Sequence, residues 1–239
     1  MTNKIADVSQ RQAALVAGIS LILMAVSAGF AYGFVFNSLV VPGDAAATTA
    51  NLAASEALFR AGIFGWLFIL ILDVVVAWAL YVFLRAANQS LSLLTAWLRL
   101  SYAALLGAGL LSLVTVLLLV GNAGYLGVFE TDQVSALVML SLDAFEGIWS
   151  IGLVVFGCHL LLLGYLVLQA DYVPGILGIL LIIAAAGYLI VPLAELLLPT
   201  YATYTAMLEL VFTVPMIIGE LGFGVWLLIK GGKGSGNEA

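Results

Sequence analysis

The stretch that decides the fold is ALFRAGIFGWLFILILDVVVAWALYVFLRA, residues 57–86. Between Arg60 and Arg85 it carries a single charged side chain, Asp73. A hydrocarbon core about 30 Å thick is crossed by about 20 helical residues, so this stretch is long enough to span a bilayer as one helix. Strands are excluded because the run lacks the in–out alternation of a membrane barrel, and open strands in lipid would leave backbone groups unpaired.

Similar apolar stretches recur along the chain and predict its class. We expect six transmembrane helices near residues 12–40, 57–86, 91–121, 132–170, 175–198 and 201–230. Hydrophobic residues make up 64% of the 239 positions and charged residues only 8%, whereas soluble domains carry roughly 25% charged residues. So few charges could not cover a folded surface in water. The sequence therefore predicts an all-α, polytopic membrane helix bundle.

The expected organisation is one transmembrane domain, residues 12–230, between a cytoplasmic N-terminal tail, residues 1–11, and a flexible cytoplasmic C-terminal tail, residues 231–239. The fourth stretch is too long for one crossing, since its residues would form about 60 Å of helix. Its first half must project or lie on the outer surface, or the helix must bend near Gly147; a break there gives a seven-helix alternative. The even-numbered helices end in similar aliphatic runs, which suggests three tandem helical hairpins as a further hypothesis.

Lysine and arginine predict the orientation, because they are enriched in the cytoplasmic loops of membrane proteins. In a six-helix layout, five of them fall on one side of the membrane: Lys4, Arg11, Arg85, Lys230 and Lys233. Only Arg60, one turn into the second helix, lies near the other side. We therefore expect an inner (plasma) membrane protein with both termini in the cytoplasm.

Four ionisable residues fall near the middle or inner half of the predicted helices, where each costs roughly 2.5–3.5 kcal/mol or more. We expect them to form an intramembrane polar site between helices two, three, four and six: Asp73, Arg99, His159 and Glu220. Other interpretations stay open. Arg99 could extend to the inner headgroups, and His159 could be a neutral histidine bonded to a carbonyl. The whole network could also serve only to hold helices together.

A second group of ionisable residues is predicted near the outer ends of the helices. This outer-layer polar cluster contains Arg60, Asp143, Glu146, Glu195 and Glu209. In both groups carboxylates outnumber permanent cations, so some acids must be protonated, bind a cation or face water. Alternatively, Asp143 and Glu146 are solvated on a projecting helix and Glu195 lies at the membrane interface.

Several chemistries are excluded by what the chain lacks. With Cys158 as its one cysteine and His159 as its one histidine, it has no disulfide framework, no thiol pair and no paired-histidine zinc motif. We expect no metal site and no cofactor. No basic stripe is present, so nucleic acid is not an expected partner. The expected partner is the lipid bilayer; candidates beyond it are a small molecule, a lipid, a cation, a second copy of the chain or another membrane protein.

Motifs spread over nearly the whole chain carry a resemblance to a known family. They include VPGDAAAT at 41–48, ASEALFR at 54–60, the Leu72-Asp73 pair, HLLLLGYL at 159–166 and GEL at 219–221. Together they resemble the bacterial multi-pass membrane proteins of the domain of unknown function 4386 family. The resemblance implies a membrane protein of about six helices, and it supplies no activity and no catalytic residue.

The sequence is compatible with three functional hypotheses. The first, and the favoured one, is a structural, regulatory or accessory membrane subunit in which the polar residues hold helices together. The alternative is a small-molecule or proton-linked transporter or binding protein that uses the polar site. A second alternative is an intramembrane acid–base enzyme that pairs His159 with Asp73 or Glu220.

Overall fold

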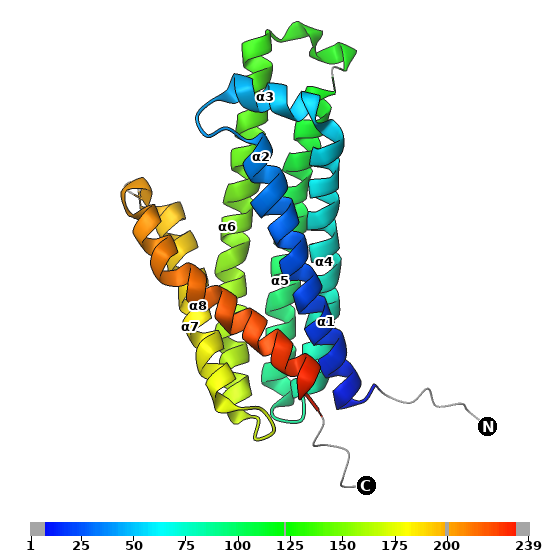
Figure 1. Ribbon diagram of the computed structural model, residues 1–239, viewed down its shortest axis with the longest axis vertical. Coiled ribbons are helices and arrows are strands. Elements are labelled where there is room, and N and C mark those ends of the chain that lie inside the picture. Colours follow the sequence, from blue (N-terminus) through cyan, green and yellow to red (C-terminus); the bar gives the residue numbers. More distant parts are fainter. Residues whose placement is uncertain (1–7, 122, 199–200, 233–239) are drawn as a thin grey trace, which may run out of the picture.

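The computed structural model describes residues 8–121, 123–198 and 201–232, and in this part of the chain every regular element is a helix (Figure 1). Six helices are long and apolar enough to cross a membrane. The first combines α1 (Gln10–Ala28), the π-helical η1 (Gly29–Phe36) and α2 (Asn37–Leu39). The others are α4 (Glu56–Leu84), α5 (Gln89–Val120), α6 (Thr131–Gln169), α7 (Gly175–Leu197) and α8 (Tyr201–Ile229). The prediction of an all-α bundle with six transmembrane helices is confirmed.

Local sequence explains where several helices begin. The side chain of Ser9 accepts a hydrogen bond from the backbone N–H of Gln12 at the start of α1. Asn88 caps α5 in the same way through the N–H of Leu91, at 3.1 Å. Such caps satisfy backbone donors that have no partner inside the helix. At Gly43 the backbone has a φ of 77°, so glycine suits the turn that ends the first crossing.

One short helix was not expected. The polar connection after the first crossing contains α3 (Ala45–Ala54), capped by Asp44, whose Oδ1 accepts from the N–H of Ala47 at 2.9 Å. Helix α3 lies across one end of the bundle, where it contacts α4, α5 and α6 (Figure 1). A further short helix, η2 (Gly124–Val128), lies at the same end before α6.

The fourth crossing, α6, is a single helix of 39 residues that continues through Gly147. At 1.5 Å per residue it is about 58 Å long, and its first turns project beyond the neighbouring crossings (Figure 1). Gly147 does not break the helix, because the residues on both sides of it continue the α-helix without interruption. The seven-helix alternative is therefore wrong, and the first turns of the helix project as one of the predictions required.

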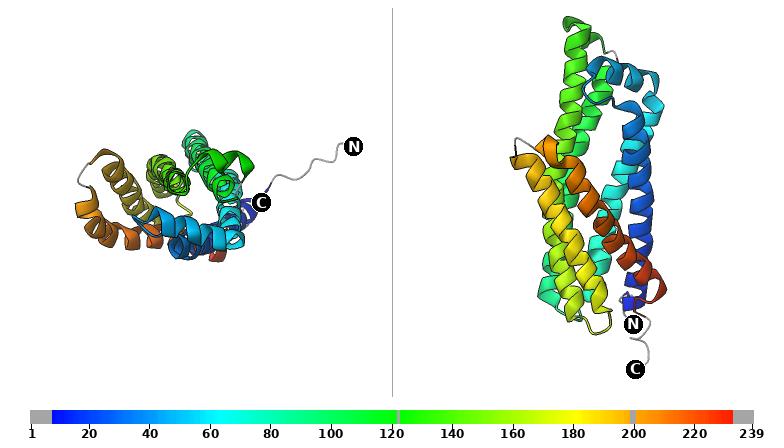
Figure 2. Two further views of the ribbon diagram at one scale, coloured as in Figure 1. Left: turned by 90° about the horizontal axis from the view of Figure 1, so that it is seen from above. Right: turned by 60° about the vertical axis from the view of Figure 1, so that its left-hand side comes forward.

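The six crossings are arranged as a closed ring. Each packs against the next in the chain, and α8 returns to pack against α1 (Figure 2). Because all consecutive crossings are in contact, these contacts do not single out three separate hairpins, and the hairpin repeat stays a prediction. The start of α1 and the end of α8 lie together at the end of the bundle opposite α3 (Figure 1).

The end of the bundle that carries the termini is closed by contacts between α1 and α8. The guanidinium of Arg11 donates to the carbonyl oxygens of Leu227, Leu228 and Gly231, at 2.7–3.1 Å. The carbonyls of Leu227 and Leu228 belong to the last turn of α8, where backbone carbonyls have no partner within the helix, and Gly231 follows the helix. Toward the α3 end, α1 and α8 diverge (Figures 1 and 2).

Two apolar clusters fill the bundle. One lies toward the termini and includes Val76, Leu80 and Phe83 of α4. The other lies toward α3 and includes Trp66 and Ile69 of the same helix. On α4 the boundary between the clusters falls at Asp73, so the polar residue stands where the apolar packing is interrupted.

Close contact between α6 and α7 yields a test of the packing. A Cβ at Gly164 would lie 2.7 Å from the carbonyl oxygen of Gly178, whereas a Cβ at Gly147, on the same helix, would meet no heavy atom within 4 Å. We expect Gly164→Ala to destabilise the protein by about 1–3 kcal/mol, because overpacking forces the helices apart. Gly147→Ala is the matched control and should be neutral or stabilising, since alanine favours helix. Thermal unfolding in detergent measures both; equal melting temperatures would contradict the packing.

Candidate functional site

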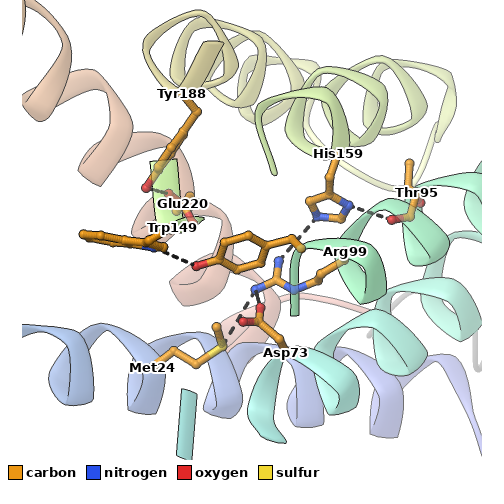
Figure 3. A network of polar contacts seen from close by, with 9 residues as sticks. Met24, Asp73, Thr95, Arg99, Trp149, His159, Tyr188 and Glu220 are labelled. Atoms are coloured by element: carbon orange, nitrogen blue, oxygen red, sulfur yellow. Dashed lines mark hydrogen bonds and ion pairs between the residues drawn. The ribbon is translucent and has the colours of Figure 1, made fainter. Parts of the chain in front are cut away.

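An ion pair between Asp73 of α4 and Arg99 of α5 lies inside the bundle. The Nη2 atom of Arg99 is 2.7 Å from Oδ1 of Asp73, and the two side chains are 2% and 0% exposed. Nη1 of Arg99 also lies 3.4 Å from Nε2 of His159 (Figure 3). Three of the four residues of the predicted intramembrane polar site are therefore in direct contact with one another through Arg99. Arg99 does not extend to the headgroups, so the snorkelling interpretation is wrong.

The hydrogen bonds of His159 define its protonation. Its Nδ1 lies 2.8 Å from the carbonyl oxygen of Thr95, which can only accept, so Nδ1 carries the proton. Its Nε2 faces a guanidinium, which can only donate, so Nε2 is the acceptor. His159 is therefore a neutral histidine with both ring nitrogens engaged. Arg99, and not a carboxylate, is its side-chain partner, so the expected pairing of His159 with Asp73 or Glu220 is not observed.

Arg99 has two further neighbours that suit a buried cation. Its Nη2 lies 3.7 Å from the sulfur of Met24 on α1, and its Cζ lies 5.2 Å from the centre of the Phe156 ring on α6. A guanidinium over an aromatic face is attracted by the negative charge of that face. Arg99 consequently connects α5 to α1, α4 and α6.

Glu220 lies on α8, apart from the ion pair but on the same cavity. Its Oε1 accepts a hydrogen bond from the hydroxyl of Tyr188 on α7, at 2.5 Å (Figure 3). Beside it, the indole N–H of Trp149 points to the hydroxyl oxygen of Tyr102, at 3.4 Å. The structure therefore places all four predicted inner residues around one region, although Glu220 makes its direct contact with Tyr188.

A cavity of about 570 Å³ joins these groups. Residues of α1, η1, α4, α5, α6, α7 and α8 line it, so α1 and α7 contribute in addition to the four helices that were expected. Its polar lining includes Asp73, Arg99 and Glu220, and most of the remaining wall is aliphatic or aromatic. Pockets of roughly 300–1,000 Å³ with an apolar wall and a few polar groups are typical of small-molecule sites.

The cavity reaches the outside of the bundle between α1 and α8. Several lining residues are also exposed on the surface of these crossings: Ala25, Tyr32, Thr213 and Ile217. These positions lie where the two crossings diverge. In a membrane, an opening at this place would face lipid.

The cavity also contains polar atoms that lack hydrogen-bond partners. Neither carboxylate oxygen of Asp73 has a hydrogen bond of acceptable geometry, although Oδ1 is within ion-pair distance of Arg99, and Nε of Arg99 has none either. A buried polar group without a partner costs free energy comparable to a lost hydrogen bond. Oδ2 of Asp73 is therefore a group that a bound molecule could satisfy.

The structure assembles only part of the outer-layer cluster: Glu146 lies close enough to Glu195 and Asp143 for their charges to interact, whereas Arg60 is paired elsewhere. Arg60 is paired with Glu56, one turn earlier on α4, at 2.6 Å, and both side chains are largely exposed, so its charge is used locally. Glu195 is exposed and accepts from the hydroxyl of Ser150 at 2.6 Å. Asp143 is exposed and Glu146 is half-buried; the side chain of Glu209 lies outside the described part of the chain. Among the described residues, no group of three or more His, Cys, Asp or Glu could hold a metal ion.

Four residues that contribute to the intramembrane polar site were not predicted from the sequence: Met24, Trp149, Phe156 and Tyr188. Trp149 and Tyr188 each lie near the middle of a long apolar helix, whereas tryptophan and tyrosine in membrane proteins concentrate at the two interfaces. Their depth was a signal that could have been used. Met24 and Phe156 gave none, because they are ordinary apolar residues in apolar helices.

The ion pair generates a prediction for stability. Removing one partner of a buried pair leaves an uncompensated charge and costs roughly 3–5 kcal/mol, whereas replacing both with apolar residues is often close to neutral. We expect Asp73→Leu and Arg99→Met each to lower the melting temperature strongly. The double variant should lie nearer to the unsubstituted protein. Thermal unfolding of all four proteins in detergent gives the coupling; additive losses would show that the two side chains do not interact.

A model of the family described as domain of unknown function 4386 matches residues 16–231. An uncharacterized protein of the archaeon Archaeoglobus fulgidus is 35% identical over 171 residues, which cover 72% of this chain and 84% of the relative. No solved structure matches. With six membrane-crossing helices and a family match over most of its length, the chain is a multi-pass membrane protein and belongs to the domain of unknown function 4386 family.

Proposed function

We propose that this protein is a membrane-embedded binding protein whose cavity holds a small, largely apolar molecule against Asp73, Arg99 and Glu220. The observation that carries the proposal is the combination of a cavity of about 570 Å³ with a fully buried carboxylate, Asp73, whose Oδ1 contacts Arg99 and whose Oδ2 has no partner. A mostly apolar wall would hold the body of the ligand, and the few polar groups would fix its orientation. A transport step is not required for this function.

A purely structural role, which the sequence alone favoured, accounts for only part of the site. The contacts of Arg99 with Asp73 and His159 do link α4, α5 and α6, as a structural network would. Packing alone would instead favour a filled interior, because unfilled volume in a core is destabilising. It would also favour a partner for each oxygen of Asp73. The cavity and the unpartnered oxygen therefore support binding over packing alone.

An intramembrane acid–base enzyme is less well supported. A general base must present a free lone pair to the proton that it removes. In His159 the only nitrogen able to accept faces Arg99, and the other donates to a backbone carbonyl. The ring therefore lacks a nitrogen that is available to a substrate.

The proposed location is the inner (plasma) membrane, with both termini in the cytoplasm. The start of α1 and the end of α8 lie together (Figure 1), and Arg11 and Lys230 lie at that end of the bundle. Arg85, at the end of α4, lies there as well. The enrichment of positive charge in cytoplasmic loops supports this orientation.

Binding can be tested by mass spectrometry of the protein released gently from its own membrane. Ala28 lines the cavity, whereas Ala108 is exposed on the outside of α5. We expect the unsubstituted protein and Ala108→Phe to retain the same small molecule. Ala28→Phe should lose it, because the phenyl ring would occupy the cavity. If all three proteins carry the same adducts, or none carries any, the ligand does not occupy this cavity and the structural role is the better explanation.

Orientation can be tested with single cysteines and a maleimide that does not cross membranes. The native Cys158 is first replaced by serine. Val128, 82% exposed near the start of α6, and Asp171, exposed in the connection between α6 and α7, are then changed to cysteine in separate proteins. In intact cells we expect labelling at position 128 only, and at both positions after lysis. The reverse pattern in intact cells would place the termini outside.

A further inference from the structure

The aromatic side chains around the cavity are arranged in two groups on its wall. In the first, Trp66 packs edge-on against Trp149 with ring centres 5.0 Å apart, and Tyr32 lies 5.3 Å from Trp149. In the second, Phe156 lies 4.9 Å from Tyr102 and 5.0 Å from Tyr188. All six rings line the cavity. The face of such a ring carries negative charge and attracts organic cations, which are commonly held in cages of aromatic residues.

The charges around the cavity have an excess of carboxylates. Asp73 and Glu220 line it from α4 and α8, and Arg99 is the one permanent cation in its lining. The two terminal nitrogens of the Arg99 guanidinium are engaged by Asp73 and His159 and its plane lies over Phe156, whereas its Nε has no hydrogen-bond partner. With both acids ionised, one negative charge is left without a counter-charge, and burial of an unpaired charge is costly. A monovalent cation in the cavity would remove this cost.

The unpartnered oxygen of Asp73 indicates where that cation would be held. Oδ1 faces Arg99, and Oδ2, which is fully buried, has no hydrogen-bond partner (Figure 3). Glu220 stands on the opposite side with one of its oxygens bonded to Tyr188. A positive group between the two carboxylates would lie among the aromatic rings and close to both acids.

The depth of the site limits the source of the cation. Asp73 lies roughly 16 Å from the end of α4, at 1.5 Å per residue, and well inside a hydrocarbon core about 30 Å thick. A lipid headgroup normally stays at the interface, and a hydrated metal ion would have to shed water next to apolar walls. A free molecule with an apolar body and one positive group matches the depth, the wall and the charge.

From these contacts we infer that the ligand is an amphipathic organic cation, an amine or quaternary ammonium compound, which enters from the bilayer between α1 and α8 and is bound between Asp73 and Glu220. The inference rests on the proposed binding function and adds the chemical class of the ligand. Experiments can separate the two proposals, because a neutral or anionic ligand would agree with the binding function but not with the inferred cation.

Three probes of nearly equal shape separate the ligand classes. Benzyltrimethylammonium is a cation, neopentylbenzene is its neutral isostere with carbon in place of nitrogen, and benzylsulfonate is an anion of similar size. Binding to the full-length protein in lipid nanodiscs is measured by titration calorimetry, and the signal from Ala28→Phe is subtracted as the contribution of the bilayer. We expect the cation to bind at least about tenfold more tightly than either other probe.

Variants of the carboxylates test the assigned position. We expect Glu220→Gln to weaken binding of benzyltrimethylammonium about tenfold and to leave binding of neopentylbenzene unchanged. Glu56→Gln, at the exposed end of α4 and paired with Arg60, is the matched control and should bind the cation as the unsubstituted protein does. Because Glu220 bonds only to Tyr188 among the described contacts, its replacement is less disturbing to the fold than that of Asp73; retained melting temperature confirms folding.

The outcomes distinguish the two proposals. Preferred binding of neopentylbenzene or benzylsulfonate, or a molecule retained from the native membrane that lacks a positive group, overturns the cation inference while the binding function stands. A retained lipid, including one with an amine or quaternary ammonium headgroup, would also overturn the cation inference, because the bound group would be a lipid headgroup and not a free cation. If no probe binds above the Ala28→Phe background and no molecule is retained, both proposals fail. A retained amine or quaternary ammonium compound that is not a lipid supports both.

Discussion

The buried ion pair of Asp73 and Arg99 is the interaction on which the rest of the interior depends. A charge taken out of water is tolerated only when it is compensated, and inside a bundle surrounded by lipid no solvent can do so. Several helices therefore supply contacts to the guanidinium of Arg99: Asp73 of α4, His159 of α6 and Met24 of α1. This requirement brings α1, α4, α5 and α6 to one point and leaves the aromatic wall around it.

The bilayer explains why the crossings could be predicted from sequence. Its thickness imposes helices of known length, and the expected ranges agree with the six observed helices to within a few residues. Helix α3 was not expected, although alanine, the strongest helix former, dominates residues 45–54 and Asp44 is a favourable N-cap. The π-helical segment at 29–36 was not expected either, since its apolar sequence is indistinguishable from that of an α-helix.

The site could be predicted only in part, for a related reason. Asp73, Arg99, His159 and Glu220 are conspicuous because each is costly in lipid, so the sequence identified them without showing their contacts. Which residue faces which depends on the rotation of each helix, and uniformly apolar helices carry little information about rotation. For that reason the pairing of His159 with a carboxylate was expected, whereas the structure places Arg99 between His159 and Asp73. The cavity depends on the same rotations and left no trace in the sequence.

The contacts that hold the bundle together and the proposed binding cavity lie toward different ends of the bundle. Near the termini, a Cβ at Gly18 would lie 2.8 Å from the carbonyl oxygen of Gly224, and Arg11 bonds to the last turn of α8, so α1 and α8 are held in close contact. Toward α3 the same two helices diverge, and exposed side chains such as Ile217 border the cavity. A closed end that fixes the helices allows the other end to remain open without loss of the bundle. The ion pair lies between these two regions, where Arg99 links α5 to α1, α4 and α6 while both Arg99 and Asp73 line the cavity.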